Sequence, residues 1–330
     1  MLDVRRLRLL REVKLRGTLA AVAEALAYSP SSVSQQLTLL EKEVGVPLLE
    51  KSGRRVLLTP QAEVLVEHAN KVLDALERAE AELTASLTTV RGTVRMAVFQ
   101  SAAHAVIPQA LSILAKEYPE LRVEVTEREP DTGLFEVSAR DFDLVIAEQY
   151  PGRTREHRPD LDRVHLCADV IRLATGPLDG SASGGVAARS TVDRGAALGM
   201  ASRGPATPLR SLADVRSLPW VMEPVGTASR QWATQLCRSA GFEPDVRFET
   251  ADLMAHIRLI RSGNAVGLLP DLVWAGEAPS VTLLDLPGQP HRDVFTAARR
   301  SSAERPGVSA CREALARAVE LVATPAMPAG

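Results

Sequence analysis

A row of short polar side chains near the N-terminus has the chemistry of a surface that binds nucleic acid. Ser31, Ser34, Gln35, Thr38 and Lys42 share one face of a helix predicted over residues 30–44. Hydroxyl groups and the free amides of a helix N-terminus can hold phosphate oxygens, and a glutamine amide can pair with a base edge. The same face could simply be solvated, so the neighbouring elements decide between these two interpretations.

The helix that carries this face has clear signals at both ends. Ser29 is suited to cap it, Pro30 fits its first position, and Gly45 is typical of a left-handed stop. Its opposite face is an apolar stripe with steps of three and four residues, formed by Val33, Leu37, Leu40 and Val44.

Two shorter helices are predicted upstream. The first has an apolar face at Leu7, Leu10 and Val13 and ends near Gly17, and the second covers residues 20–26. Because only a short connection separates the second helix from the third, the pair is typical of a helix-turn-helix.

A two-stranded hairpin is predicted after the third helix. Leu48–Leu49 and Val56–Leu58 flank a tight turn, and its tip carries three cations, Lys51, Arg54 and Arg55. Such a wing places positive charge against phosphate or the minor groove. The charge balance agrees, since residues 1–60 hold ten basic and six acidic side chains while the other 270 residues carry a net charge of −6. This asymmetry indicates a basic nucleic-acid-binding module on an acidic body.

The run SPSSVSQQLTLLEKEVGVPLLEKSGRRVLLT resembles the signature of the LysR-type transcriptional regulators, S-x-S/P-x-V-S followed by L-E-x-x-L-G-x-x-L-F-x-R and L-T. The resemblance implies a DNA-binding winged helix-turn-helix. Leu49 replaces the usual Phe, and Lys51 replaces an Arg and cannot make a bidentate phosphate contact. We expect the third helix to enter the major groove, with these residues binding DNA: Pro30, Ser31, Ser32, Ser34, Gln35, Thr38, Lys51, Arg54 and Arg55.

A long helix is predicted next, because the chain has no proline or glycine between Pro60 and Gly92. Its apolar residues recur at steps of three and four: Ala62, Leu65, Val66, Ala69, Val72, Leu73, Leu76, Ala79, Leu83 and Leu87. So narrow a stripe favours a seam between two helices, although packing on its own domain is an alternative. The family resemblance also implies an antiparallel linker-helix dimer here.

From Gly92 onward strands alternate with helices, which predicts an α/β body. Expected elements include one helix over Ala105–Tyr118, a strand crossing between lobes over Val164–Thr175, and strands over Val281–Leu286 and Arg292–Ala298 that return to the first lobe. The stretches GTVRMAVFQSAAHAVIP, DFDLVIAE and SGNAVGLLP resemble the family's effector-binding domain. That resemblance implies two lobes around a cleft, similar to a type 2 periplasmic binding protein.

Candidate effector-binding residues follow from their positions at strand ends and helix starts that face this cleft. They are Gln100, Ser101, Glu148, Gln149, Gly226, Thr227, Ser229 and Thr250, with Arg230 added if it points inward. Each hydroxyl alone could be only a helix cap. Together they suggest a small anionic or zwitterionic metabolite.

Two further segments and three thiols remain. Residues 178–207 form a Gly/Ala/Ser-rich insertion, expected to be a flexible surface segment or a lid, and residues 324–330 an unstructured tail. Cys167, Cys237 and Cys311 are far apart in the sequence. Free thiols are therefore favoured over a redox switch, which needs a second thiol within reach.

Catalysis is not predicted, because the sequence has no GxSxG, GxxxxGK[ST] or HExxH motif. His104, near the expected cleft mouth, is the one histidine considered as a functional candidate. No membrane-spanning run or signal peptide is recognisable. A stand-alone solute-binding protein and a protein-interaction module without DNA are the alternatives, and the basic winged module argues against both.

The sequence therefore predicts a cytoplasmic LysR-type regulator, a dimer or tetramer, in which an effector alters promoter occupancy or DNA bending. We expect a winged helix-turn-helix over residues 1–60, a linker helix over 61–91 and an effector domain over 92–330. Within that domain the first lobe is assigned to 92–167 and 271–322, and the second to 168–270. Promoter DNA, a small-molecule effector and RNA polymerase are the expected partners, with no metal or cofactor.

Overall fold

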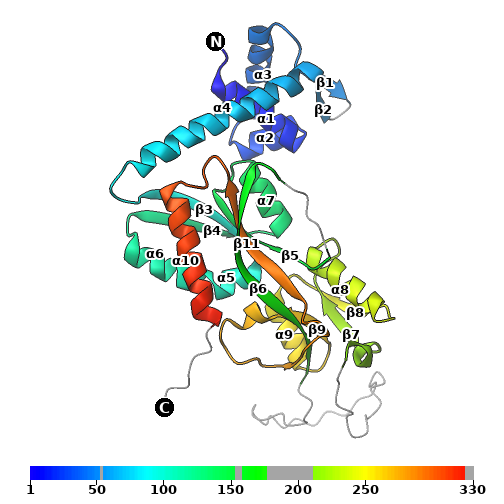
Figure 1. Ribbon diagram of the computed structural model, residues 1–330. Coiled ribbons are helices and arrows are strands. Elements are labelled where there is room, and N and C mark those ends of the chain that lie inside the picture. Colours follow the sequence, from blue (N-terminus) through cyan, green and yellow to red (C-terminus); the bar gives the residue numbers. More distant parts are fainter. Residues whose placement is uncertain (53–54, 153–157, 177–210, 324–330) are drawn as a thin grey trace, which may run out of the picture.

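The computed structural model describes the chain except for residues 53–54, 153–157, 177–210 and 324–330 (Figure 1). The insertion expected at 178–207 and the tail expected at 324–330 lie outside the described residues. The N-terminal unit begins with three helices, α1 (Val4–Arg16), α2 (Leu19–Ala25) and α3 (Pro30–Val44).

The ends of α3 lie where the capping signals predict. Ser29 Oγ accepts a hydrogen bond from the Ser32 amide at 3.1 Å, and Gly45 ends the helix with a φ of +75°. A left-handed φ of this kind favours glycine, which has no Cβ to clash. The apolar stripe of α3 is buried against α1, α2 and the hairpin that follows.

That hairpin pairs β1 (Leu49–Ser52) with β2 (Arg55–Leu58) in antiparallel register. The helix α4 (Pro60–Ala85) then leaves the winged unit, with Thr59 as its cap. The first half of its apolar stripe is not available for dimerisation, because Val66 and Ala69 pack in the core of the winged unit. Val72, Leu76, Leu83 and Leu87 remain exposed.

The first lobe is built on a mixed sheet. Its strands lie in the order β4-β3-β5-β11-β6, with β3 parallel to both of its neighbours and β11 antiparallel to β5 and β6. Their bounds are β3 (Gly92–Val98), β4 (Leu121–Glu127), β5 (Leu144–Gln149), β6 (Leu161–Thr175) and β11 (His291–Arg299). Helices α5 (Gln100–Ala105), α6 (Ile107–Glu117) and α10 (Pro306–Ala323) share one hydrophobic core with this sheet, and α7 (Pro130–Ser138) packs in a second.

The helix expected over Ala105–Tyr118 is confirmed as α6, which begins two residues later and ends one residue earlier. A separate short helix, α5, precedes it: the chain breaks at Val106 between α5 and α6, and Pro108 occupies the first turn of α6. Proline has no N–H to continue a helical ladder, so a new helix begins there.

The second lobe grows from the far half of β6, which pairs with β9 (Gly267–Pro270) and β10 (Thr282–Leu284). Beside them lie the parallel strands β7 (Pro219–Met222) and β8 (Asp245–Glu249), and α8 (Ala228–Ser239) and α9 (Leu253–Arg261). Two short 3-10 helices complete the lobe, η1 (Leu212–Val215) and η2 (Asp271–Trp274).

Assigning all of residues 271–286 to the first lobe is therefore a mistake, although Leu272 does pack in the first-lobe core. Val273 and Val281 are buried in a second-lobe core, and Leu286 in another. Of the two strands expected to return, only β11 pairs within the first lobe.

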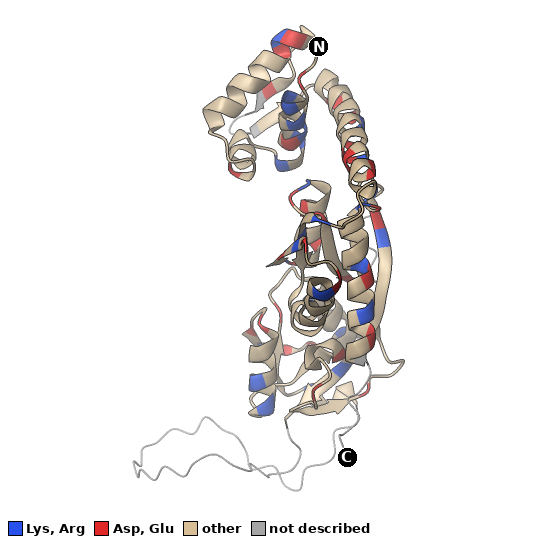
Figure 2. Ribbon diagram, turned by 90° about the vertical axis from the view of Figure 1, so that its left-hand side faces the viewer, with Lys and Arg blue, Asp and Glu red and all other residues tan. Residues whose placement is uncertain are grey.

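The three parts follow one another along the molecule, with the winged unit at one end and the second lobe at the other (Figure 2). No helix among the described residues is both long enough and apolar enough to cross a membrane.

Candidate functional site

The polar face of α3 points into solvent. Pro30, Ser31, Ser34, Gln35 and Thr38 lie on this side of the helix, and we call these five residues the recognition face. The Gln35 amide and the Ser34 hydroxyl make no hydrogen bond within the described part of the chain. Ser32 is half-buried, and its backbone amide donates to the capping hydroxyl of Ser29.

Two adjacent glutamines on α3 have different environments. Gln36 Oε1 accepts a hydrogen bond from Arg6 Nε at 3.0 Å, which ties α3 to α1. Gln35 projects from the exposed side. Of the two, Gln35 therefore keeps both its donor and its acceptor for a partner.

Two of the expected wing cations lie in described strands, Lys51 in β1 and Arg55 in β2. The third, Arg54, lies outside the described residues.

A second candidate site is a cavity where the second lobe meets the crossing strands. The space enclosed between its walls is about 40 Å³, and the cavity opens toward solvent. Most of its lining is apolar or aromatic, with polar groups from Glu223, Ser229, Arg230, His256 and Arg292. The aromatic walls are Tyr150 and Trp232, whose ring centroids lie 5.5 Å apart.

Arg292 anchors a buried ion cluster on the first-lobe side of this cavity. Its Nε donates to Asp169 Oδ2 at 2.9 Å and its Nη2 to Ser101 Oγ at 2.6 Å, and its Nη1 donates to Glu148. Burial disfavours the charged guanidinium, yet the two carboxylates outweigh that effect and raise the pKa of Arg292. We call Ser101, Glu148, Asp169 and Arg292 the cleft cluster.

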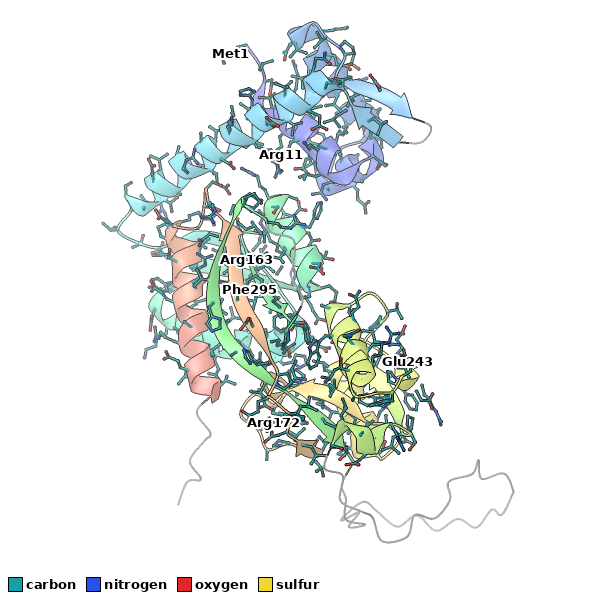
Figure 3. The ribbon with its side chains drawn as sticks, turned by 45° about the vertical axis from the view of Figure 1, so that its right-hand side comes forward. Met1, Arg11, Arg163, Arg172, Glu243 and Phe295 are labelled. Atoms are coloured by element: carbon teal, nitrogen blue, oxygen red, sulfur yellow. The ribbon has the colours of Figure 1, made fainter. Side chains whose placement is uncertain are left out.

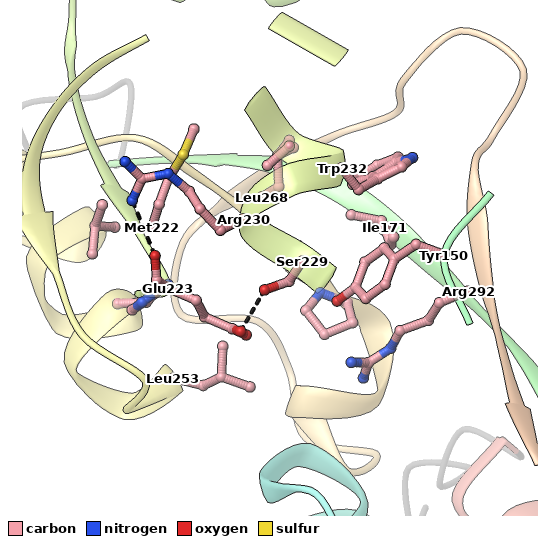
Figure 4. A pocket seen from close by; sticks show the side chains of 14 residues that line it. Tyr150, Ile171, Met222, Glu223, Ser229, Arg230, Trp232, Leu253, Leu268 and Arg292 are labelled. Atoms are coloured by element: carbon pink, nitrogen blue, oxygen red, sulfur yellow. Dashed lines mark hydrogen bonds between the residues drawn. The ribbon is translucent and has the colours of Figure 1, made fainter. Parts of the chain in front are cut away.

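The predicted residues at the start of α8 are arranged around Glu223. Ser229 Oγ donates to the Glu223 carboxylate, and Arg230 Nη1 donates to the Glu223 carbonyl at 3.0 Å (Figure 4). Thr227 caps α8. Of the predicted second-lobe residues, Ser229 and Arg230 line the cavity, whereas Gly226, Thr227 and Thr250 do not.

The other predicted residues hold the lobes and loops in place. Gln100 Oε1 accepts from the Leu253 amide at 2.8 Å, so this side chain bridges α5 and α9 across the lobes. Thr250 contributes its carbonyl to His256 Nε2 at 2.8 Å. Gln149, at the end of β5, is half-buried outside the cavity lining, and His104 is exposed.

Sequence reasoning missed most of the side chains that line the cavity. Tyr150, Glu223, Trp232, His256 and Arg292 were not singled out, because each comes from a different segment. One signal was available for Tyr150 and Glu223, since each directly follows a strand of the type used to select Gln149 and Thr250.

A second ion cluster joins the linker helix to the first lobe, and we call it the junction cluster: Asp74, Glu77, Arg140, Arg299 and Ser301. Arg299 Nε donates to Glu77 Oε1 at 2.8 Å, and Arg140 Nη2 donates to Asp74 Oδ1 at 2.6 Å. Burial raises the pKa of Glu77, but the bonds from Arg299 and Ser301 outweigh it and hold that pKa below its usual value.

Helix α1 makes further contacts between the winged unit and the first lobe at the same junction. Arg11 is only 6% exposed. It donates to the Ser138 carbonyl at the end of α7 and to Asn70 on α4, and lies between the two parts of the molecule (Figure 3). Arg16 Nη2 bonds Asp141 Oδ2 at 2.7 Å. The winged unit is therefore held on the first lobe by several charged bonds.

The three thiols are unsuited to rapid oxidation. Burial, helped by Asp169, raises the pKa of Cys167 to about 11, and burial raises those of Cys237 and Cys311 to about 12. Because the thiolate is the reactive form, these cysteines are poorly reactive at neutral pH.

Comparisons with known families agree with this architecture. Residues 4–63 match the "Bacterial regulatory helix-turn-helix protein, lysR family", and residues 88–178 and 197–320 match the "LysR substrate binding domain". The chain therefore belongs to the LysR family of DNA-binding transcriptional regulators, whose second domain binds a small-molecule effector.

Individual relatives span most of the chain. The transcriptional dual regulator GltC of Bacillus subtilis (strain 168) is 28% identical over 282 residues, 86% of this chain and 85% of GltC. A probable hydrogen peroxide-inducible genes activator of Mycobacterium avium is 27% identical over 260 residues, 78% of this chain and 75% of that protein. The solved structure of a full-length OxyR variant from Pseudomonas aeruginosa, with one cysteine replaced by aspartate, has a TM-score of 0.63 at 18% identity. It covers 100% of this chain and 99% of that one, which shows a shared fold.

Proposed function

We propose that the recognition face of α3 enters the major groove of promoter DNA, while Lys51, Arg54 and Arg55 contact the backbone or the minor groove. The observation that carries this proposal is the separation of the two faces of α3. Val33, Leu37 and Leu40 are buried, whereas Ser31, Ser34 and Gln35 are exposed. Ser32 and Thr38 then assist at the edge of the same surface.

The functional unit in this proposal is a homodimer, or a tetramer built from dimers. Val72, Leu76, Leu83 and Leu87 leave an apolar edge on and just after α4. A second copy would cover this edge, and two winged units would then read two half-sites. A Leu76→Glu variant should dissociate in size-exclusion chromatography with light scattering, and an unchanged mass would count against this seam.

The effector, in this proposal, binds in the interlobe cavity and changes promoter occupancy or DNA bending. One strand connects the two regions, since β11 carries Arg292 in the cleft cluster and Arg299 in the junction cluster. Arg140 adds a positive φ of 72° beside the junction, a conformation that is strained for a residue with a Cβ. A shift of β11 on ligand binding would therefore reach the linker helix.

The protein so proposed regulates transcription in the cytoplasm, with RNA polymerase as a partner at the promoter, and catalyses no reaction. A gel-shift experiment with DNA from beside its own gene tests the core of this proposal. Saturable binding that survives competitor DNA is expected. Folded protein that binds no such fragment would contradict it.

A further inference from the structure

The cavity lining carries two arginines and one glutamate, and negative charges outnumber positive ones only once the carboxylates bonded to these arginines are included. Arg292 meets Glu148 and Asp169, and Arg230 Nη1 lies 3.4 Å from Glu249 Oε2. Glu223 adds a further carboxylate in the cavity wall. Because both guanidinium groups already face carboxylates of this chain, neither offers an uncompensated charge to an anionic ligand.

The start of α8, which the sequence suggests as an anion site, already faces a carboxylate of the protein. Ser229 Oγ donates to Glu223 Oε2, and Figure 4 shows the two side chains pointing toward each other. An anionic effector would have to approach Glu223 closely. The geometry therefore argues against the anionic metabolite suggested by the hydroxyl-rich sequence pattern.

The cavity instead presents hydrogen-bond acceptors. Glu223 Oε1 receives no bond from any residue that the structure describes. His256 is 2% exposed, and its Nε2 donates to the Thr250 carbonyl. Its Nδ1 is then an acceptor, and it has no partner among the described residues. Glu223 is half-buried and His256 is buried, so a ligand with N–H groups would bond the open carboxylate oxygen of the first and satisfy the unpartnered nitrogen of the second.

The remaining walls suit an apolar body carrying one positive charge. Tyr150 and Trp232 are 6% and 9% exposed, and Ile171, Leu253 and Leu268 complete this part of the lining. Aromatic faces attract cations and also pack against rings and aliphatic chains.

We propose that the effector is a small primary amine that binds as its ammonium ion. The ammonium group donates to Glu223 and to His256 Nδ1, and the apolar body packs against Tyr150 and Trp232. This inference rests on the proposed role of the cavity as the effector site and specifies the ligand that the site takes.

The test compares three probes of similar size, benzylamine, benzyl alcohol and benzoate, by titration calorimetry with the full-length protein. Benzylamine should bind about tenfold or more tightly than benzyl alcohol, with benzoate weakest, because a charged hydrogen bond in a desolvated site is worth that difference. Benzoate binding more tightly than benzylamine would overturn the proposal. Absence of benzylamine binding at millimolar concentration would also overturn it.

Variants test whether Glu223 is the source of the preference for benzylamine. Glu223→Gln keeps the shape of the side chain and should remove the preference for benzylamine over benzyl alcohol, while Glu223→Asp should weaken it. Glu243→Gln is the matched control, because Glu243 is paired with Arg238 on the surface of the same lobe, away from the cavity lining. A Glu223→Gln protein that unfolds at the wild-type temperature and keeps the full preference would refute the assignment.

Gel shifts on the same samples separate this proposal from the function on which it rests. If promoter DNA binds but benzylamine does not, the amine assignment fails and the regulator proposal stands. If benzylamine binds but no promoter fragment does, the regulator proposal fails and the assignment of the cavity as an amine site stands.

Discussion

The recognition face and the cleft cluster are both polar, but their bonds are arranged in opposite ways. On α3, exposed hydroxyls and the Gln35 amide lie on one continuous helix face with capacity left for a partner. In the cleft, Arg292 is 3% exposed and its three nitrogens are bonded to Asp169, Glu148 and Ser101. The Gln35 amide and the Ser34 hydroxyl therefore stay available to another molecule, although the Ser31 and Thr38 hydroxyls bond within the chain. The cleft cluster instead satisfies its own groups and ties α5, β5 and β6 to β11.

This difference predicts that substitutions in the cleft cluster act mainly on folding. Arg292→Met should give the largest effect, a loss of about 3–5 kcal/mol in the free energy of unfolding, because it leaves two buried carboxylates without their cation. Urea denaturation measures it. Arg238→Met, which breaks a fully exposed ion pair, is the control and should leave the midpoint unchanged. Equal midpoints for wild type and Arg292→Met would contradict the assigned role.

The junction cluster should give an intermediate effect that depends on pH. Glu77→Gln should cost about 2 kcal/mol at neutral pH, because charge-assisted bonds to Arg299 are lost. The pKa of Glu77 is lowered in the folded state. Its contribution is therefore complete above the ordinary carboxyl pKa of 4.5 and is lost as pH falls through the lowered value. Thermal unfolding across this range should show the wild-type advantage shrink below pH 4.5, and a constant difference would be inconsistent with this pairing.

The recognition face should respond in specificity and hardly at all in stability. Gln35→Ala should reduce discrimination between operator variants by about tenfold, the value of one base-edge contact, without changing the melting temperature. Quantitative gel shifts with single-base operator variants measure this. Gln36→Ala is the matched control, since its side chain is held by Arg6. Identical specificity profiles for the two variants would remove Gln35 from the readout.

Peroxide should have the smallest effect. The raised thiol pKa values of Cys167, Cys237 and Cys311 leave little thiolate at neutral pH. Native protein treated with hydrogen peroxide should therefore keep its free-thiol count and DNA affinity, while denatured protein loses thiols. Rapid loss of a thiol from the native protein would instead support the hypothesis of a redox switch.

The recognition face and the cleft cluster also differ in how far the sequence predicts them. The recognition face could be predicted because the apolar stripe lies within one helix, with Ser29 and Gly45 directly at its ends, and all of them obey local rules. The cleft cluster could be predicted only in part. Arg292 meets Asp169, Glu148 and Ser101 across 123, 144 and 191 residues of sequence, and only strand pairing brings them together. Ser101 and Glu148 were predicted because they lie at strand ends and helix starts that face the cleft. Nothing in the local sequence marks Arg292, which bonds to both of them.

The most direct test of the account is affinity cleavage from a single cysteine on the recognition face. Ser34→Cys places an exposed thiol there, whereas the native thiols of Cys237 and Cys311 are buried and Cys167 is partly so. Iron–EDTA attached at position 34 of protein bound to promoter DNA should cut within the major groove of two half-sites. Cleavage spread evenly along the fragment, with binding intact, would show that α3 does not read the DNA.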